Sequence, residues 1–254
     1  MPQTGFVKFL GTAGARFVMI KQLRASGGIW ISTSDTDILV DPGPGSIVQC
    51  NKSRPKLDPS GLDAIILTHR HLDHSSDINV MIEAMTQGGF KKRGTVFCPP
   101  DALDEDPVIL RYTRSLLGKL EILEQNSSYK TGGFKFETSM PHIHPVLTYG
   151  IKFKIGKTAI ALLTDTKYFL ELKDFYATDI LIISVVFSQP RPDIQHLSLL
   201  DVKEIISQTK PRKVILTHFG MTMLRAKPHL LARELTNELG IEVVAAYDGM
   251  TLHF

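Results

Sequence analysis

The sequence contains little cysteine and no long hydrophobic run. Cys50 and Cys98 are the only cysteines among 254 residues, and they do not form a C-x-x-C motif, so no disulfide framework is expected. No segment approaches the roughly 18 apolar residues that a transmembrane helix requires. The first residues, MPQTGFVKFL, also lack the apolar stretch of a signal peptide. These absences predict a cytoplasmic protein without a membrane span.

The chain also lacks a strong excess of charge of either sign. Its net charge is +3, although the pI of about 8.8 is basic. This balance suits an anionic substrate but is too small to establish nucleic-acid binding. The hydrophobic content of 43% and the charged content of 22% are typical of globular proteins. A chain of this length can bury a sizeable core without disulfides.

Short apolar runs rich in β-branched residues recur along the sequence and are bounded by Gly, Pro, Asp or Asn. They predict strands at residues 6–10, 29–33, 37–41, 64–68, 94–98, 133–139, 149–155, 158–164, 180–185, 213–217 and 242–246. Helical periodicity predicts helices at residues 76–87, 107–117, 198–208 and 228–239. Ser198 is the expected N-cap of the third helix, and Gly240 ends the fourth. The pattern predicts one α/β domain over residues 1–254, with layered sheets covered by helices.

The most specific chemical motif lies in the segment LTHRHLDHSSD, at residues 67–77. His69, His71, Asp73 and His74 form the pattern H-x-H-x-D-H directly after an apolar run. Imidazole and carboxylate groups are the usual ligands of zinc and of similar metals. Because such crowding offers little to a metal-free turn, the motif predicts a metal site.

Three further residues lie beside predicted strands. Asp165 follows the strand that ends in LLTDT, His218 follows the strand that ends in ILTHFG, and His144 precedes the strand that begins at Gly150. At such positions α/β folds assemble functional sites from loops on a rigid scaffold. Taken alone, each has an ordinary explanation, as a solvated or core histidine or as a turn aspartate.

Taken in chain order, these residues resemble the metallo-β-lactamase superfamily. The resemblance extends from FLGTAGA at residues 9–15 and ILVDPGPG at residues 38–45 to the final helix and the DGM segment. It implies an αββα four-layer sandwich of two mixed β-sheets flanked by helices, with the metal site along one edge of both sheets. This implied fold agrees with the alternation of strands and helices described above.

The resemblance also implies a dinuclear metal site. His69, His71 and His144 would hold one divalent ion, and Asp73, His74 and His218 would hold the second. Asp165 would bridge the two ions. Imidazole and carboxylate ligands suit zinc, with manganese and iron as alternatives.

Some neighbouring residues have alternative roles. His142 competes with His144, which is preferred because a histidine six positions before a glycine resembles the third motif of the family. His142 is then expected beside the ligands or facing solvent. Arg70 and Leu72 alternate with the ligands and are expected to point away from the metals. Asp41 would either support the metal loop or open a Pro-Gly turn.

The reaction is not determined by the ligands. Two ions about 3.5–4 Å apart would generate a metal-bound hydroxide and stabilise an oxyanion, which serves phosphodiesters, thioesters and lactams alike. Asp73 is expected to take part in catalysis as well as to bind a metal ion. His196 favours a phosphodiester, because it resembles a histidine of the ribonuclease Z branch that assists phosphate cleavage. Its alternative role is that of a residue flanking the start of a helix.

The substrate is expected to be small. Only 14 residues separate Gly150 from Asp165, enough for a β-hairpin, whereas the ribonuclease Z family commonly carries a tRNA-binding arm in this interval. The expected substrate is therefore a small phosphodiester or a short nucleic acid rather than tRNA. The alternatives are a thioester hydrolase of the glyoxalase II type and a non-catalytic metal-binding domain. Whether the chain forms a homodimer stays open.

Overall fold

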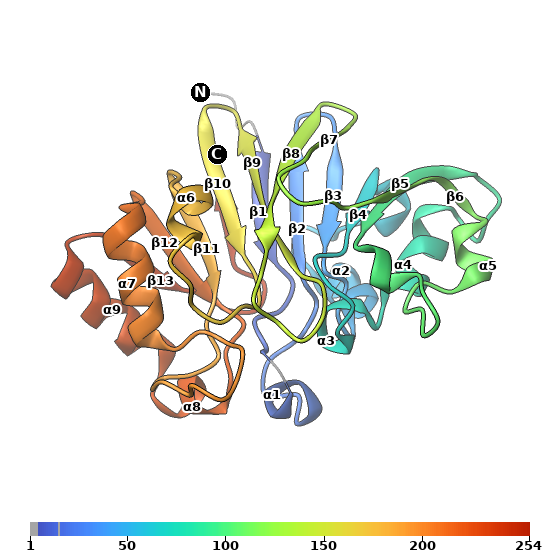
Figure 1. The fold of residues 1–254 in the computed structure, drawn as a ribbon. Coiled ribbons are helices and arrows are strands. Elements are labelled where there is room, and N and C mark those ends of the chain that lie inside the picture. Colours follow the sequence, from blue (N-terminus) through green and yellow to red (C-terminus); the bar gives the residue numbers. More distant parts are fainter. Residues whose placement is uncertain (1–4, 15) are drawn as a thin grey trace.

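We describe residues 5–14 and 16–254 of a computed structural model, in which the strands form two seven-stranded β-sheets that face each other (Figure 1). The first sheet contains, in spatial order, β14 (Thr251–His253), β1 (Gly5–Phe9), β2 (Ile29–Thr33), β3 (Asp37–Val40), β4 (Ala64–Ile66), β5 (Arg93–Cys98) and β6 (Leu117–Ile122). The second contains β13 (Glu242–Ala245), β12 (Lys213–Thr217), β11 (Ile180–Ser184), β10 (Thr158–Leu163), β9 (Tyr149–Ile155), β8 (Phe134–Pro141) and β7 (Ser128–Thr131).

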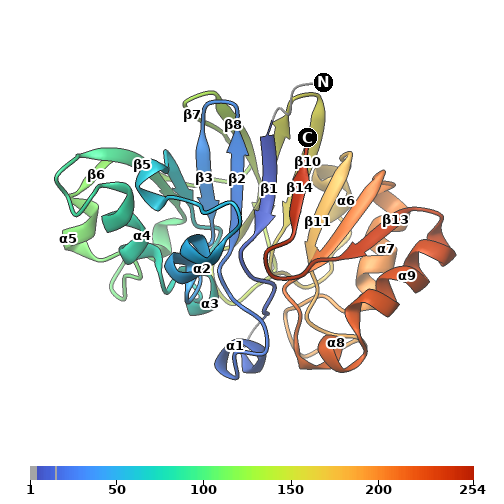
Figure 2. The same cartoon turned by 180° about the vertical axis from the view of Figure 1, so that it is seen from behind.

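Helices cover the outer faces of both sheets, as Figures 1 and 2 show from opposite sides. The first sheet carries α2 (Ser46–Lys52), α4 (Ile78–Met85) and α5 (Arg111–Arg114). The second carries α6 (Leu172–Tyr176), α7 (Leu199–Thr209) and α9 (Pro228–Leu239). The shorter helices α1 (Phe17–Ile20), α3 (Leu72–Ser75) and α8 (Met221–Arg225) lie near the lower edge in Figure 1. The predicted αββα sandwich of two mixed sheets is therefore confirmed.

Three apolar clusters hold these layers together. The central cluster fills the space between the sheets, where alternate residues of β8, such as Phe134 and Phe136, point inward. The rings of Phe97 and Phe136 meet edge to face across this space, with centroids 5.1 Å apart. Each fully buried side chain of this size contributes about 1.5–3 kcal/mol. One outer cluster lies between each sheet and the helices that cover it.

The predicted elements differ from the observed ones at the edges of the sheets and in the short helices, because α1, α2, α3, α6 and α8 were not predicted. The predicted helix at residues 107–117 is wrong, because only Arg111–Arg114 is helical and β6 begins at Leu117. The edge strands β6, β7 and β14 were not predicted, since edge strands carry many charged side chains and lack the apolar runs of central strands. Ser198 caps α7 through a reciprocal capping box with Asp201, as expected.

The topology brings the candidate ligands to one edge of the sandwich. β3, β4, β5 and β6 are parallel, as are β10, β11, β12 and β13, so their carboxyl ends share an edge within each sheet. Asp41 follows β3, His69 follows β4, Asp165 follows β10 and His218 follows β12. Loops at the carboxyl ends of parallel strands are where α/β folds place their sites.

Candidate metal centre

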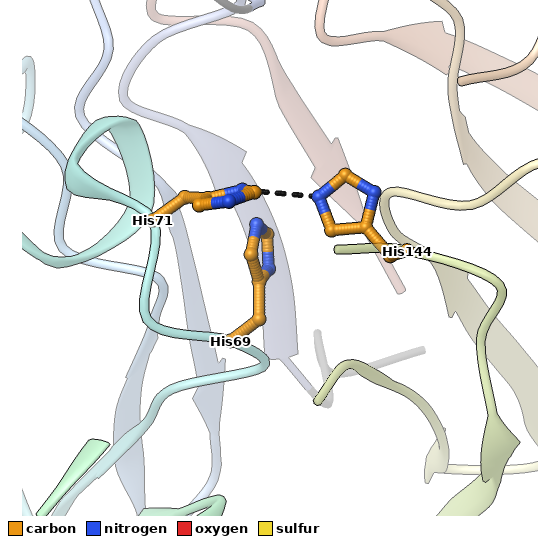
Figure 3. A group of neighbouring side chains, drawn as sticks. All are labelled: His69, His71 and His144. Carbon is orange, nitrogen blue, oxygen red and sulfur yellow. Dashed lines mark hydrogen bonds between the residues drawn. The ribbon is translucent and has the colours of Figure 1, made fainter. Parts of the chain in front are cut away.

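The first ligand set, defined as His69, His71 and His144, converges from two loops (Figure 3). His71 Nδ1 lies 3.0 Å from His144 Nε2, and the ring of His69 stands 5.0 Å from that of His71 and 5.2 Å from that of His144. One ring nitrogen from each residue lies within 4.8 Å of the others. The three nitrogens can therefore contact a single cation.

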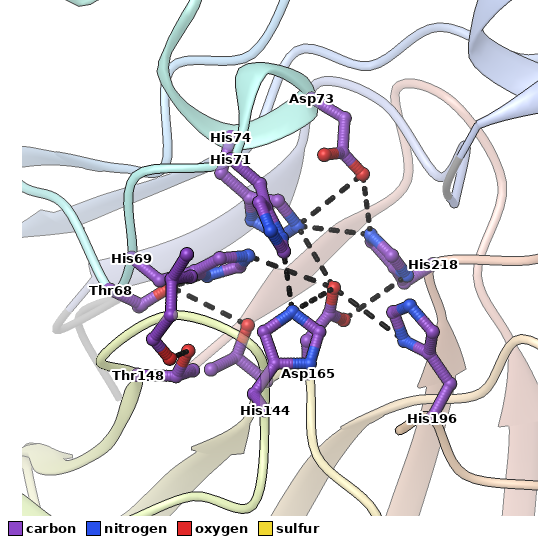
Figure 4. A network of polar contacts seen from close by, with 12 residues as sticks. Thr68, His69, His71, Asp73, His74, His144, Thr148, Asp165, His196 and His218 are labelled. Atoms are coloured by element: carbon purple, nitrogen blue, oxygen red, sulfur yellow. Dashed lines mark hydrogen bonds and ion pairs between the residues drawn. The ribbon is translucent and has the colours of Figure 1, made fainter. Parts of the chain in front are cut away.

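The second ligand set, defined as Asp73, His74, Asp165 and His218, contains two carboxylates and two imidazoles (Figure 4). His74 Nε2 lies 3.0 Å from His218 Nε2, 3.5 Å from Asp165 Oδ2 and 3.7 Å from Asp73 Oδ2. His218 Nε2 lies 3.3 Å from Asp73 Oδ2. A tetrahedral shell with bonds of about 2.0–2.2 Å places its ligand atoms roughly 3.3–3.6 Å apart. The observed spacing fits such a shell.

Asp165, a member of the second set, also faces the first set. Its Oδ2 atom is 3.8 Å from His69 Nε2 and 4.0 Å from His144 Nε2, in addition to its approach to His74. The carboxylate is only 1% exposed. Its two carboxylate oxygens thus face histidines of both sets, as a bridging ligand would.

The buried polar atoms of this cluster provide a test of whether metal ions fit it. Within the described part of the chain, His69 Nε2 and both carboxylate oxygens of Asp165 are buried and have no hydrogen-bond partner. Buried polar atoms are normally paired, and a buried unpaired carboxylate is costly. Cations bound by these atoms would satisfy them, so the donor set fits divalent metal ions.

Three histidines are oriented by acceptors on their far side. His74 Nδ1 lies 2.9 Å from Asp41 Oδ2, His69 Nδ1 lies 3.0 Å from Thr68 Oγ1, and His144 Nδ1 lies 3.1 Å from the Gln195 carbonyl. Each Nδ1–H can donate to its acceptor, which leaves the Nε2 lone pair facing the cluster. Such outer contacts fix the tautomer of metal-ligating histidines.

Asp41 has the supporting role rather than a turn role alone. Its Oδ1 accepts from the Thr68 backbone N–H at 2.7 Å, and its Oδ2 accepts from Thr68 Oγ1 at 2.7 Å as well as facing His74. The Asp41 carboxylate thus orients His74 directly, and it orients His69 through Thr68. The backbone of Asp41 is left-handed, with φ of 52°. No sequence pattern indicates this role of Thr68, although Thr68 directly precedes His69.

Burial and neighbouring charges shift the pKa of His74 in the direction opposite to that of the three histidines of the first set. Burial lowers the pKa of His69 and His71, and it lowers the pKa of His144 to about 4. Burial also acts to lower the pKa of His74, but the carboxylates of Asp73 and Asp41 outweigh it and raise that pKa well above its usual value. The first set is therefore neutral, as metal ligands must be.

His218 is held in a strained conformation by its neighbours. Its φ of 59° is unusual for a residue with a side chain, and such strain concentrates at functional sites. A Cβ atom at Gly14 would lie 2.3 Å from the His218 carbonyl oxygen and 2.9 Å from its Nδ1. Glycine is therefore required in the FLGTAGA segment, whose last residue, Ala15, lies outside the described residues.

His142 contacts the backbone of the candidate ligand Asp165 and does not join either ligand set. Its Nδ1–H donates to the Asp165 carbonyl at 3.0 Å, and its Nε2 accepts from the Tyr176 hydroxyl at 2.6 Å. The histidine is 6% exposed, so the expectation that it lies beside the ligands holds and the solvent-facing alternative is wrong. A Cβ atom at Gly150 would lie 1.7 Å from Tyr176 Oη, which explains a glycine there.

His196 lies next to the cluster and also just before the start of α7. Its Nδ1 is 3.7 Å from Asp165 Oδ2, and its ring centroid is 5.1 Å from that of His144 (Figure 4). Ser198 provides the cap of α7, so His196 has no capping role. Arg70 pairs with Asp101 at 3.7 Å, and Leu72 is 65% exposed, so neither joins the ligand sets.

The chain belongs to the beta-lactamase superfamily, because a beta-lactamase superfamily domain matches residues 36–219. An uncharacterized protein of Methanocaldococcus jannaschii, MJ1374, is 30% identical over 95% of this chain and 92% of its own length. The probable metallo-hydrolase YhfI of Bacillus subtilis is 27% identical over 76% and 80%. A ribonuclease Z of Thermoplasma acidophilum is 29% identical over 57% of this chain and 47% of its own length.

Solved structures show the same fold. The crystal structure of Bacillus subtilis YhfI aligns with a TM-score of 0.81 and 21% identity, covering 99% of this chain and 100% of that one. A diphosphatase from the PhnP family aligns with a TM-score of 0.72 and 19% identity, covering 98% and 97%. The expected resemblance to the metallo-β-lactamase superfamily and its ribonuclease Z-like members is thus confirmed. This fold implies divalent metal ions and a metal-dependent hydrolase.

No helix in residues 5–14 and 16–254 is long and apolar enough to cross a membrane.

Proposed function

We propose that this hydrolase cleaves a small phosphodiester at a dinuclear metal centre. The observation that carries the proposal is the position of His196, which is 13% exposed and lies beside the shared carboxylate Asp165. It adds a hydrogen-bonding group to a cluster whose seven candidate ligands are already accounted for. A ribonuclease Z and a diphosphatase among the similar proteins also support phosphate chemistry.

The two ligand sets would each hold one divalent ion, with Asp165 contacting both. When bound, such ions lower the pKa of water and neutralise charge on a phosphoryl oxygen. Imidazole and carboxylate ligands favour zinc, and manganese or iron are alternatives. Burial acts to raise the pKa of Asp73, but His74 and His218 outweigh it and hold that pKa at about 2. Asp73 is therefore an ionised carboxylate that can also orient the attacking water.

His196 would act on the phosphate. Burial lowers the pKa of His196, whereas Asp165 acts to raise it, so the ring is neutral near pH 7. A neutral ring donates a hydrogen bond to a phosphoryl oxygen through its N–H. A bound phosphodiester places negative charge beside the ring and raises its pKa, which allows it to protonate the leaving alkoxide.

The surroundings of the centre fit a small substrate. A cavity of about 650 Å³ opens beside the first ligand set. Its lining combines four apolar residues with polar and charged ones: Leu72, Pro107, Val108 and Val146, with Arg70, His71, Ser75, Ser76, Asn79 and Asp106. This cavity can take an organic group attached to the scissile phosphate. β9 and β10 form a hairpin in which Ile155 pairs with Thr158, so no arm for tRNA extends from this interval. A short nucleic acid or a small phosphodiester therefore suits the site better than tRNA.

A substrate screen tests this proposal. Metal-loaded protein is assayed with bis-p-nitrophenyl phosphate, 2′,3′-cyclic nucleotides and S-lactoylglutathione. Turnover of the phosphodiesters above that of the thioester is expected. Preferential cleavage of S-lactoylglutathione would instead indicate a thioester hydrolase of the glyoxalase II type. Absence of turnover on all three, with metal bound, would favour a non-catalytic metal-binding domain.

A further inference from the structure

Lys8 of β1 is a buried cation remote in sequence from every candidate ligand. It is 4% exposed, and its Nζ donates to the Arg54 carbonyl at 3.2 Å and to Thr251 Oγ1 at 3.0 Å. Among the described residues, no carboxylate oxygen lies within ion-pair distance of this ammonium group. Lysines are almost never fully buried unless they are paired. Burial lowers the pKa of Lys8, as expected for a cation without a counter-charge.

Ser53 provides a second, independent observation at the same place. Its side chain is 8% exposed, and its Oγ atom has no hydrogen-bond partner in the described part of the chain. Buried hydroxyl groups are normally paired. Ser53 and Lys8 both line one cavity of about 270 Å³, between the C-terminal end of α2 and the β1 and β14 pair. Figure 2 shows these two strands side by side on the face where α2 is visible.

The remaining polar groups around this cavity make it positive. Lys52 and Arg54 add two exposed cations, and Gln49 adds an amide. Asp248 is the one acidic residue in the lining. Its Oδ1 accepts from the backbone N–H and the hydroxyl of Thr12, and its Oδ2 accepts from the Ala25 N–H, so both oxygens are already engaged.

We propose that this cavity, defined by Lys8, Ser53, Lys52 and Arg54, binds a compact anion of the phosphate class. Phosphate oxygens accept hydrogen bonds from an ammonium and a hydroxyl, and such charge-assisted bonds are the strong ones. The ligand is inorganic phosphate or the phosphate group of a nucleotide, which present the same chemistry to these donors. The site shares no residue with the two ligand sets and is independent of the proposed phosphodiesterase function.

Site counting by calorimetry tests this proposal, because phosphate also binds a dinuclear metal centre. Inorganic phosphate is titrated into metal-loaded wild-type protein and into Lys8→Met, which keeps most of the apolar stem. Two binding sites are expected in the wild type and one in Lys8→Met. Lys152→Met, a lysine of the second sheet, is the matched control and should retain two. Equal stoichiometry in Lys8→Met and wild type would overturn the proposal.

Two further measurements keep the test decisive if Lys8→Met does not fold. Ser53→Ala and the exposed Lys52→Ala should each weaken the second site, and together they should weaken it about tenfold or more. In crystals soaked with tungstate, a phosphate analogue, density is expected beside Lys8 Nζ. Tungstate at the metal centre alone, or unchanged affinity in the double variant, would refute the site. Competition between adenosine monophosphate and inorganic phosphate then identifies which of the two sources binds more tightly.

Discussion

The two ligand sets of the candidate metal centre differ in charge. The first contains only histidines, and burial lowers the pKa of each. The second contains Asp73 and Asp165, and its His74 has a raised pKa because two carboxylates outweigh the effect of burial. Negative charge attracts a cation across several ångströms, whereas neutral imidazoles act only on contact. The second set therefore attracts a cation through its charge, whereas the first holds a cation through direct contact with its imidazoles. We therefore expect the second set to bind its ion more tightly.

Removal of Asp165 should have the largest effect, because this carboxylate faces histidines of both ligand sets. Asp165→Ala is expected to lower hydrolysis by more than the roughly 10–100-fold that loss of an outer-shell partner causes, and to weaken binding of both ions. The fold should persist, since the variant removes a costly buried carboxylate. Activity, elemental analysis and thermal unfolding measure these effects. Asp174→Ala on α6, an exposed aspartate, is the control. Unchanged turnover and metal content would make Asp165 a turn residue.

His196 should affect chemistry without affecting either ligand set. His196→Ala is expected to lower kcat on an alkyl phosphodiester by about 10²–10⁴, the usual range for general acid–base groups. Metal content should not change. The loss should be smaller with p-nitrophenyl esters, whose leaving group needs little protonation, and absent with a thioester. His229→Ala, an exposed histidine of α9, is the control. Equal activity of His196→Ala and wild type on the alkyl ester would refute the assigned role.

Single ligand substitutions should separate the two sets. His144→Ala is expected to leave the ion of the second set bound and to weaken the other, because His144 contributes only to the first set. Asp73→Asn should do the reverse. Stepwise metal titration monitored by calorimetry distinguishes the two outcomes. Loss of both ions in each variant would show that the sets do not bind independently.

The smallest expected effect concerns pH and His142. Burial lowers the pKa of His142 to about 4, compared with about 6.5 for an unfolded histidine. Between these values the unfolded chain binds more protons than the folded one, so the free energy of unfolding should decrease as pH falls from about 6.5 to 4. His142→Gln should make this decrease shallower. Denaturant unfolding at a series of pH values measures the difference, and identical pH profiles would contradict it.

The sequence identified the chemical groups of the site better than their supports. His69, His71, Asp73 and His74 are adjacent in sequence, and Asp165, His144 and His218 stand beside apolar runs that form strands. The structure brings them together, because parallel strands direct their carboxyl ends to one edge.

The supports of the ligands were harder to predict. Asp41 was expected either to support the metal loop or to open a turn, and its contact with His74, 33 positions away, depends on a left-handed backbone. The bond between His142 and Tyr176 spans 34 positions and depends on how α6 packs against β9 and β10. Gln195 acts through its backbone carbonyl, so its side-chain identity gives no signal. Contacts of this kind follow from tertiary packing alone.

Metal stoichiometry tests the central claim most directly. Protein loaded with excess zinc and freed of unbound metal should contain two ions per chain by elemental analysis. Binding should weaken as pH falls toward the range where histidines titrate, because the ligands must be deprotonated. One ion or none per chain at saturation would contradict the dinuclear centre and the division of its ligands into two sets.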